Sequence, residues 1–284
     1  MALRDIRTRI GSVKSTRQIT SAMKMVAAAK LRRATESATN ARPYQQTLTR
    51  TLQRVAAASR EVENPLLQAR TDVRKVMVVV VGSDRGLCAG FNANRDRRAE
   101  EFLRTLKTEG KQVTVRTYGK KPRDFFKTRG FGPTPVIDVK APQYPEEVRA
   151  LAAQLTEGFI GGEYDEAWLV FNQFKSTLTQ IPVITRVLPL SIESTDAAAG
   201  PDYLYEPDGS QILGTLLPLY LRTLLLQAFL ENEAGEYAAR MTAMDSATRN
   251  ASDLIDRLTL EYNRTRQAFI TTELIEIISG AEAL

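Results

Sequence analysis

The sequence predicts an α/β fold: a long antiparallel coiled coil of the N- and C-terminal helices with an open-sheet α/β domain inserted between them. Both ends of the 284-residue chain are rich in helix-forming residues and carry apolar positions at helical spacing. The middle alternates β-branched runs with helical segments, as mostly parallel sheets do. We expect one terminal helix over 1–60, the domain over 73–192 and the other terminal helix over 210–284.

The N-terminal segment is predicted to form one long helix. Between Leu3 and Arg60 it contains a single glycine, Gly11, and a single proline, Pro43. Its first apolar positions are three or four residues apart: Leu3, Ile6, Ile10 and Val13. Further along, Met23–Ala29 is apolar nearly all round, and a helix without a polar face is normally enclosed. The sequence therefore predicts a helix that is partly surrounded by other protein.

The middle segment is predicted to alternate strands with helices. We expect strands at Val73–Val81, Gln112–Tyr118, Val136–Val139, Glu166–Phe174 and Pro182–Leu190, and helices at Asn92–Glu109, Lys121–Thr128 and Pro145–Phe159. This order predicts a Rossmann-like open sheet, mostly parallel, with helices on both faces. The segment Asp196–Gly209, rich in Ala, Gly, Pro and Asp, is the expected linker back into helix.

The C-terminal segment carries the clearer helical repeat. Alternating steps of four and three visit eleven positions, eight apolar and three threonine: Tyr237, Met241, Met244, Thr248, Ala251, Ile255, Leu258, Tyr262, Thr265, Phe269 and Thr272. This seam predicts a coiled coil. A helix from Ser210 to the end would be roughly 110 Å long and is expected to extend beyond a compact domain.

Two features of this helix need separate interpretation. Pro218 is expected to bend it or to mark a break near its start. The leucine-rich stretch Ile212–Leu230 has nearly the length of a membrane span, but it contains Pro218 and, near its centre, Arg222. Arginine in the middle of a span is costly, so a buried helix is favoured and no direct membrane span is expected.

Charge is distributed unevenly along the chain. Residues 1–60 carry 13 Lys/Arg against 2 Asp/Glu, whereas residues 210–284 carry 6 against 10. The strongly basic N-terminal segment indicates an acidic partner, which could be nucleic acid, anionic lipid or an acidic protein surface. The first aromatic residue is Tyr44, so stacking partners for single-stranded nucleic acid are absent from the basic segment. An acidic protein surface also accounts for the apolar Met23–Ala29, and no nucleic acid is expected.

Composition excludes several kinds of site. The chain has no histidine and one cysteine, Cys88, which removes Ser-His-Asp and Cys-His nucleophiles, imidazole metal sites and an intrachain disulfide. Cys88 is expected to be a buried small hydrophobe. The carboxylates of five glutamates are interpreted as solvated helix surface: Glu146, Glu147, Glu231, Glu233 and Glu236. Met1–Asp5 has no apolar signal-peptide core, so the first helix is expected to belong to the mature protein.

The loop Gly82–Asn92 follows the first predicted strand, where open α/β sheets bind ligands. Its glycines match neither a dinucleotide fingerprint nor a P-loop, so a tight turn is favoured over a nucleotide site. No catalytic, cofactor or metal residue is expected. A dinucleotide-binding α/β enzyme and a basic coiled-coil nucleic-acid-binding protein remain the alternatives, but neither explains two terminal helices with complementary apolar seams.

Four segments together resemble the γ subunits of F-type ATP synthases of the bacterial type. They are Ile19–Arg32, Ser83–Asn92, Ala239–Thr248 and Tyr262–Leu274 with Ser279–Ala281, so the resemblance covers essentially the whole chain. It implies a non-catalytic central-stalk rotor that turns inside a ring of three α and three β subunits and couples ion flow through the membrane sector to ATP synthesis or hydrolysis on β. The implied partners are α, β, the ε subunit and the c-ring. The implied location is peripheral, on the cytoplasmic face of the bacterial plasma membrane, without a cofactor.

The resemblance also implies three sets of contact residues. Hydrogen bonds to a β catch loop are implied for Arg266, Gln267, Thr271 and Glu273; contacts with the sleeve and the β lever for Met23, Met25, Val26, Arg32 and Arg33; and foot contacts with the c-ring or ε for Tyr205, Glu206 and Asp208. Two departures stand out. The family usually has Gly before Ala in this loop, and here the order is Ala89-Gly90. The paired cysteines of thiol-regulated plastid relatives are missing, so no disulfide switch is expected.

Overall fold

The computed structural model describes residues 3–58, 64–132, 136–137, 141–192 and 209–282. By contacts the chain divides into two compact units. We call Met1–Ala28 with Arg240–Leu284 the helical-pair unit, and Ala29–Ala239 the α/β unit. Helix α1 (Leu3–Ala58) and helix α5 (Gly209–Glu282) each contribute one part to each unit.

The α/β unit is built on a five-stranded sheet in the order β3-β2-β1-β4-β5. Its strands are β1 (Lys75–Val81), β2 (Gln112–Tyr118), β3 (Val136–Ile137), β4 (Glu166–Phe174) and β5 (Gln180–Leu188). All neighbours pair in parallel except β4 and β5, which pair antiparallel. The mostly parallel open sheet predicted from the sequence is therefore confirmed.

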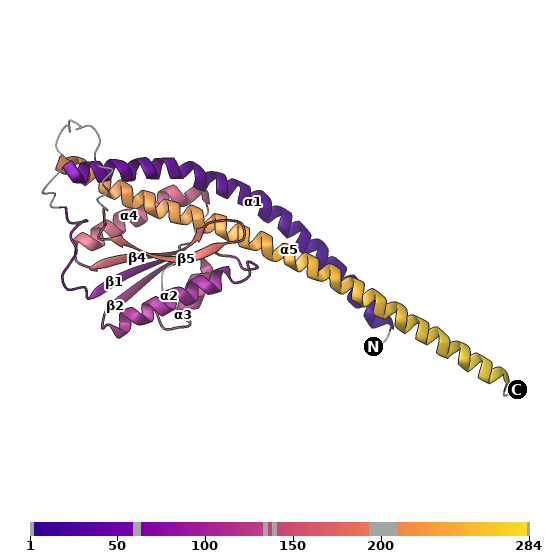
Figure 1. Cartoon of the computed structure of the whole chain (residues 1–284). Helices are drawn as coiled ribbons and strands as arrows, with labels where there is room; N and C mark the ends of the chain where they lie inside the picture. Colours follow the sequence, from indigo (N-terminus) through magenta and orange to yellow (C-terminus); the bar gives the residue numbers. More distant parts are fainter. Residues whose placement is uncertain (1–2, 59–63, 133–135, 138–140, 193–208, 283–284) are drawn as a thin grey trace. The chain divides into compact units, whose positions relative to one another are not determined.

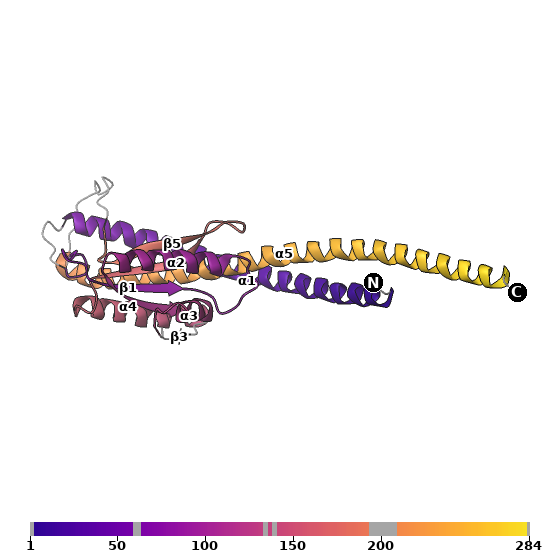
Figure 2. The same ribbon diagram turned by 90° about the horizontal axis from the view of Figure 1, so that it is seen from below.

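Helices cover both faces of this sheet (Figure 1). Helices α2 (Phe91–Thr108) and α3 (Lys120–Lys127) lie on one face, and α4 (Tyr144–Ile160), preceded by a 3₁₀ turn at Ala141–Gln143, lies on the other with parts of α1 and α5. Seen from below, α2 lies toward β5 and α3 toward β3 (Figure 2). Both faces of the sheet are thus used for the core.

The central strand β1 explains this two-sided core. Its side chains alternate between the two faces, so a run of β-branched residues supplies both. Three of them pack toward α2 and three toward α4 and α5: respectively Val76, Val78, Val80 and Met77, Val79, Val81. Burial of the strand on both faces is the arrangement that its continuous apolar sequence predicts.

Several predicted boundaries move by one or two residues. The first strand begins at Lys75 rather than Val73, because the carboxylate of Asp165 accepts hydrogen bonds from the N–H groups of Arg74 and Lys75 (both 2.8 Å) just before the ladder. The last strand begins at Gln180, before Pro182, because an edge strand tolerates proline within its length.

Of the two effects expected at Pro218, a bend or a break, the break is wrong. Helix α5 is continuous over 74 residues with Pro218 inside it. A proline within a helix costs about 3 kcal/mol, but burial of one leucine side chain recovers about 2 kcal/mol. The leucines on either side of the proline are fully buried in the α/β core: Leu213, Leu217, Leu221 and Leu225. Tertiary packing therefore holds the helix together across the proline.

The same burial bears on the membrane question. By length and composition, α5 contains a stretch apolar enough to cross a membrane. However, its leucines between 213 and 225 pack against the sheet and α4 within the α/β unit. Their apolarity is accounted for by the core of this unit, as expected from the sequence.

In the helical-pair unit, α1 and α5 pair antiparallel. The side chains that meet include Thr20 with Thr248, whose hydroxyls are 2.8 Å apart, and Lys24 with Asp245, at 2.5 Å. The predicted seam of α5 is buried or half-buried from Met241 to Thr265. Beyond Thr265 the seam is not covered by the described part of the chain: Phe269 is 60% exposed.

Candidate functional site

The loop Gly82–Asn92 is held by its own hydrogen bonds. The hydroxyl of Ser83 has two acceptors within reach of its single proton, Oδ1 of Asn92 (2.8 Å) and the carbonyl of Arg85 (3.0 Å). The Asn92 amide donates back to the Arg85 carbonyl at 3.3 Å, and the buried Arg95 guanidinium donates to Asn92 Oδ1 at 3.2 Å. These polar groups are therefore engaged in shaping a tight turn, as the sequence favours.

Gly82 is required at the start of this turn by close packing. A Cβ there would lie 2.5 Å from Cγ of Pro122 and 2.8 Å from the guanidinium of Arg95. Further along, Leu87 and Ala89 have positive φ values of 60° and 48°, a conformation that L-residues adopt at a cost. Cys88 between them is buried, as expected.

The crevice at the carboxyl ends of β1 and β4, where open α/β sheets bind ligands, is filled by α5. Asn232 donates from its amide to the carbonyl of Gly82 (3.3 Å), and Asn172 donates from its amide to the carbonyl of Phe91 (3.3 Å). A Cβ at Gly235 would lie 2.9 Å from the Phe91 ring, so the helix backbone approaches closely. These contacts of α5 occupy the position at which a dinucleotide would be expected.

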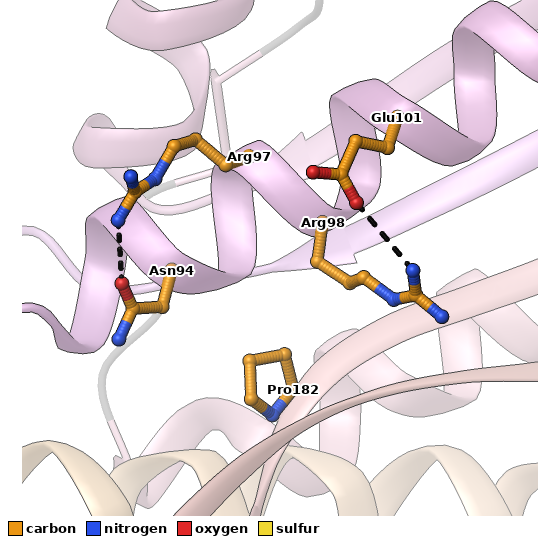
Figure 3. A pocket seen from close by; sticks show the side chains of 5 residues that line it. All are labelled: Asn94, Arg97, Arg98, Glu101 and Pro182. Atoms are coloured by element: carbon orange, nitrogen blue, oxygen red, sulfur yellow. Dashed lines mark hydrogen bonds and ion pairs between the residues drawn. The ribbon is translucent and has the colours of Figure 1, made fainter.

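Two hollows lie elsewhere in the α/β unit. One of about 360 Å³ lies between α2 and β5, and one of about 240 Å³ lies between α1, β5 and α5. Figure 3 shows the first, lined by two arginines, Arg97 and Arg98, with Asn94, Glu101 and Pro182. Among the described residues, no group of three or more Cys, Asp or Glu is placed to hold a metal ion.

The acidic residues of α5 differ from the solvated surface predicted for them. Glu231 is buried and its carboxylate accepts a hydrogen bond from the Gln227 amide at 2.8 Å. Burial, with the nearby Glu236 carboxylate, raises the pKa of Glu233 to about 7, against the opposing effect of the Lys30 ammonium. The prediction is wrong for Glu231 and Glu233 because this stretch of α5 is packed within the α/β unit. Glu146 is exposed, as expected.

The sleeve residues named from the resemblance lie along α1. Met25 and Val26 are 65% and 57% exposed, whereas Met23 is half-buried. Arg32 and Arg33 are exposed, and Arg32 pairs with Glu36 one turn along the helix at 3.1 Å. The described part of the chain thus leaves Met25 and Val26 without cover, whereas Met23 is partly covered.

The four residues expected to contact a β catch loop are all exposed on α5, beyond the end of the buried seam: Arg266, Gln267, Thr271 and Glu273. The hydroxyl of Thr271 donates to the carbonyl of Gln267 at 2.9 Å, within the helix. Apolar residues around them are exposed as well: Phe269, Ile270, Leu274, Ile275, Ile277 and Ile278. Phe269 was expected in the seam, whereas the sequence analysis gave the other five no contact role. Their position off the seam was the available signal that the helix is apolar on more than one side. Tyr205, Glu206 and Asp208 lie outside the described residues.

Comparison with known proteins gives consistent matches over the whole chain. A family model described as ATP synthase matches residues 2–284. The ATP synthase gamma chain of Geobacter metallireducens is 46% identical over 284 residues, covering 100% of this chain and 99% of the relative. The ATP synthase gamma chain of Phenylobacterium zucineum is 50% identical over 289 residues, with the same coverage.

Solved structures match the fold at lower sequence identity. A chain from the mitochondrial ATP synthase of Euglena gracilis, in an assembly of OSCP, F1 and c-ring, superposes with a TM-score of 0.63 at 22% identity, covering 99% of this chain and 94% of that chain. A chain from the central stalk and c-ring of the Tetrahymena thermophila mitochondrial ATP synthase gives 0.60 at 23%, covering 81% and 99%.

Proposed function

Because the chain belongs to the ATP synthase gamma chain family, we propose that it is the central-stalk rotor of an F-type complex and turns inside a ring of three α and three β subunits. It is a non-catalytic subunit, and ATP is made or hydrolysed on β. Rotation driven by ion flow through the membrane sector presents a different side of the rotor to each β in turn. A surface that differs from side to side biases otherwise identical subunits toward different conformations.

The observation that carries this proposal is the exposed apolar surface of the helical-pair unit. Met25 and Val26 on α1, and six apolar residues between Phe269 and Ile278 on α5, are exposed. Exposed apolar residues gathered in short stretches of helix in this way indicate a protein interface. A ring of subunits that encloses both helices accounts for this exposed apolar surface. Apolar side chains also suit a rotor that turns inside the ring, because they form no fixed polar contacts that rotation would have to break.

The contact residues take their roles within this proposal. Met23, Met25 and Val26 lie in the sleeve, and Arg32 and Arg33 face an acidic lever loop of β. At the other end, four residues of α5 hydrogen-bond a β catch loop: Arg266, Gln267, Thr271 and Glu273. The foot residues Tyr205, Glu206 and Asp208 contact the c-ring or ε. In this division, 1–60 and 210–284 form the shaft and 73–192 the foot.

The complex is membrane-associated, and we place it on the cytoplasmic face of the bacterial plasma membrane. The chain reaches the membrane sector through its partners, the c-ring and ε, and binds no cofactor of its own. Its leucine-rich stretch in α5 packs in the α/β core, which supports a peripheral attachment.

A mild-detergent pull-down of the tagged chain from its own cells tests the proposal. Native mass spectrometry of the eluate is expected to show three copies each of two larger nucleotide-binding subunits, together with Mg-ATPase activity. Replacement of Arg266 and Gln267 by alanine is expected to weaken coupling in that complex without releasing the chain. A chain that emerges alone, or with nucleic acid, would overturn the proposal.

A further inference from the structure

Strand β5 ends the sheet, and its outer edge has no strand partner among the described residues. It is nine residues long, which is enough to template another strand. The hairpin that leads into it ends in an exposed apolar side chain, Leu178, at 84% exposure, and Ile181 at the start of the strand is also exposed. An edge of this length with apolar residues beside it is normally covered or blunted.

Pro182 shows which backbone groups of β5 face outward. Within a sheet, proline lies where its missing N–H would point away from the partner strand. The backbone of its ladder partner Asn172 agrees with this orientation. The N–H of Asn172 donates to Oδ1 of Asn232 (3.4 Å) and not across to β5, so the two residues form no main-chain hydrogen bond with each other. Outward-facing groups alternate along a strand, so the N–H and C=O of Ile184 and Arg186 also point outward.

The hollow on the α2 side of this edge is basic. Pro182 of β5 faces two arginines of α2 across it (Figure 3). Arg97 donates to the neutral amide oxygen of Asn94 at 2.7 Å, and Arg98 reaches Glu101 only at 3.4 Å. The hollow of about 360 Å³ therefore carries two guanidinium groups against one carboxylate, and it favours an acidic side chain.

The hollow on the other face of the same edge has a mixed lining. It holds about 240 Å³ between α1, β5 and α5. Apolar and polar residues both line it: Leu52, Leu190, Ile192, Tyr220 and Leu224 with Thr49, Gln53, Thr185, Arg186 and Ser191. This hollow therefore selects no single kind of side chain, and the chemistry of an occupant is set by the basic hollow on the α2 side.

We propose that the β5 edge accepts an extended strand of a partner protein whose side chains toward α2 are acidic. Main-chain hydrogen bonds to Ile184 and Arg186 supply affinity, and the basic hollow selects the side chains. A second copy of this chain is a poor occupant, because two such edges would bring arginine-rich surfaces together. The inference goes beyond the rotor function and does not depend on it.

Amide hydrogen exchange on the full-length chain tests this inference, read by NMR. The probe is a short synthetic peptide that alternates aspartate and valine, and a lysine–valine peptide is its control. The aspartate peptide is expected to slow exchange at Ile184 and Arg186 by about tenfold, the effect of about 1.4 kcal/mol. Val183 and Thr185, whose amides face β4, serve as internal references and are expected to change little.

Reversing the charge of the basic hollow tests whether that hollow, and not the strand edge alone, selects the peptide. The double variant Arg97→Glu, Arg98→Glu is expected to lose the response to the aspartate peptide and to respond to the lysine peptide instead. Arg104→Glu, an exposed position on the same helix, is the matched control and is expected to behave as wild type. Equal responses to both peptides, or none to either, would overturn the inference. Protection of Ile184 that rises with chain concentration alone would identify a second copy as the occupant and also overturn it.

Discussion

The two units of this chain use apolar residues in opposite ways. In the α/β unit, the strands of the sheet and the leucines of α5 are buried by the unit's own helices, with Leu221 fully enclosed. In the helical-pair unit, only a narrow seam between α1 and α5 is buried, and Ile277 is 64% exposed. The first unit is stabilised from within, whereas the second carries apolar surface that the described part of the chain does not cover.

Two carboxylates on the same helix show the same contrast. Glu233, in the α/β unit, lies in a half-buried position where burial raises its pKa. Asp245, in the helical-pair unit, accepts a hydrogen bond from Lys24, which lowers its pKa, and pairs with Arg249 at 3.0 Å. The environment that surrounds each position therefore decides whether the charged form of a carboxyl on α5 is destabilised or stabilised.

The largest difference is expected from matched truncations in the two units. Leu221→Ala removes a fully buried side chain and is expected to lower the free energy of unfolding by about 3 kcal/mol. Ile277→Ala removes an exposed one and is expected to change it by less than about 0.5 kcal/mol. Urea unfolding, followed through the fluorescence of the single tryptophan, Trp168, measures the first. Circular dichroism of the same samples reports the unfolding of both units. Equal losses of unfolding free energy in the two variants would contradict the difference between the units.

An added charge is expected to separate coupling from stability. Met23→Lys places an ammonium group in the proposed sleeve, where it must find a partner on the ring, and is expected to reduce ATP-driven ion pumping several-fold. Because Met23 is half-exposed in the chain itself, unfolding is expected to change by less than about 1 kcal/mol. Asn40→Lys, at an exposed position of α1, is the control. Unchanged pumping by assembled Met23→Lys complex would contradict the sleeve role.

Local sequence patterns predicted most of the α/β unit. The second and fourth strands, Gln112–Tyr118 and Glu166–Phe174, were predicted to the residue because alternation and β-branched runs report local structure directly. The same reasoning expected a bend or a break at Pro218, and the break is wrong. Proline's cost is local, whereas the leucine packing that overcomes it depends on the sheet and α4, which no local pattern shows.

The candidate contact surface was predictable only in part. The spacing of Met23–Ala29 indicated that α1 needs more cover than one helix provides, and Met25 and Val26 are indeed exposed. The burial of Glu231 and Glu233 was missed, because their spacing on α5 is that of a solvated face. Which face of a long helix is covered depends on what packs beside it, and α5 passes from one environment to another along its length.

The raised pKa of Glu233 predicts a pH dependence confined to the α/β unit. A carboxyl whose folded pKa is about 7, against an ordinary value of 4.5, holds in the folded chain a proton that the unfolded chain has released. Stability therefore falls as pH rises through this window. Glu233→Gln is expected to be more stable than wild type by about 1–2 kcal/mol above pH 7, with the difference vanishing near pH 4.5.

Asp245→Asn is the control in the other unit, with the opposite sign. Because Lys24 lowers the pKa of Asp245, the carboxylate stabilises the fold above its ordinary pKa, and this contribution is lost as pH falls. The variant is expected to be less stable than wild type at neutral pH and to converge with it in acid. Urea unfolding at several pH values measures both variants. Parallel pH curves for Glu233→Gln and wild type would contradict the assignment.

The smallest expected effect lies in the turn after β1. Ala89 has a φ of 48°, a left-handed conformation in which a Cβ is strained, whereas Gly90 beside it has a φ of −78°, which any residue adopts. Ala89→Gly is therefore expected to raise the free energy of unfolding by about 0.5–1 kcal/mol. Adding Gly90→Ala brings a Cβ to 3.0 Å from the amide nitrogen of Asn94, the mobile end of a side chain, so the double variant should keep the gain. A loss of stability in Ala89→Gly would mean that the turn is held by contacts of the alanine methyl group. A higher free energy of unfolding in Ala89→Gly, measured on the chain alone, would show that the strained backbone at Ala89 lowers the stability of the α/β unit without any partner being involved.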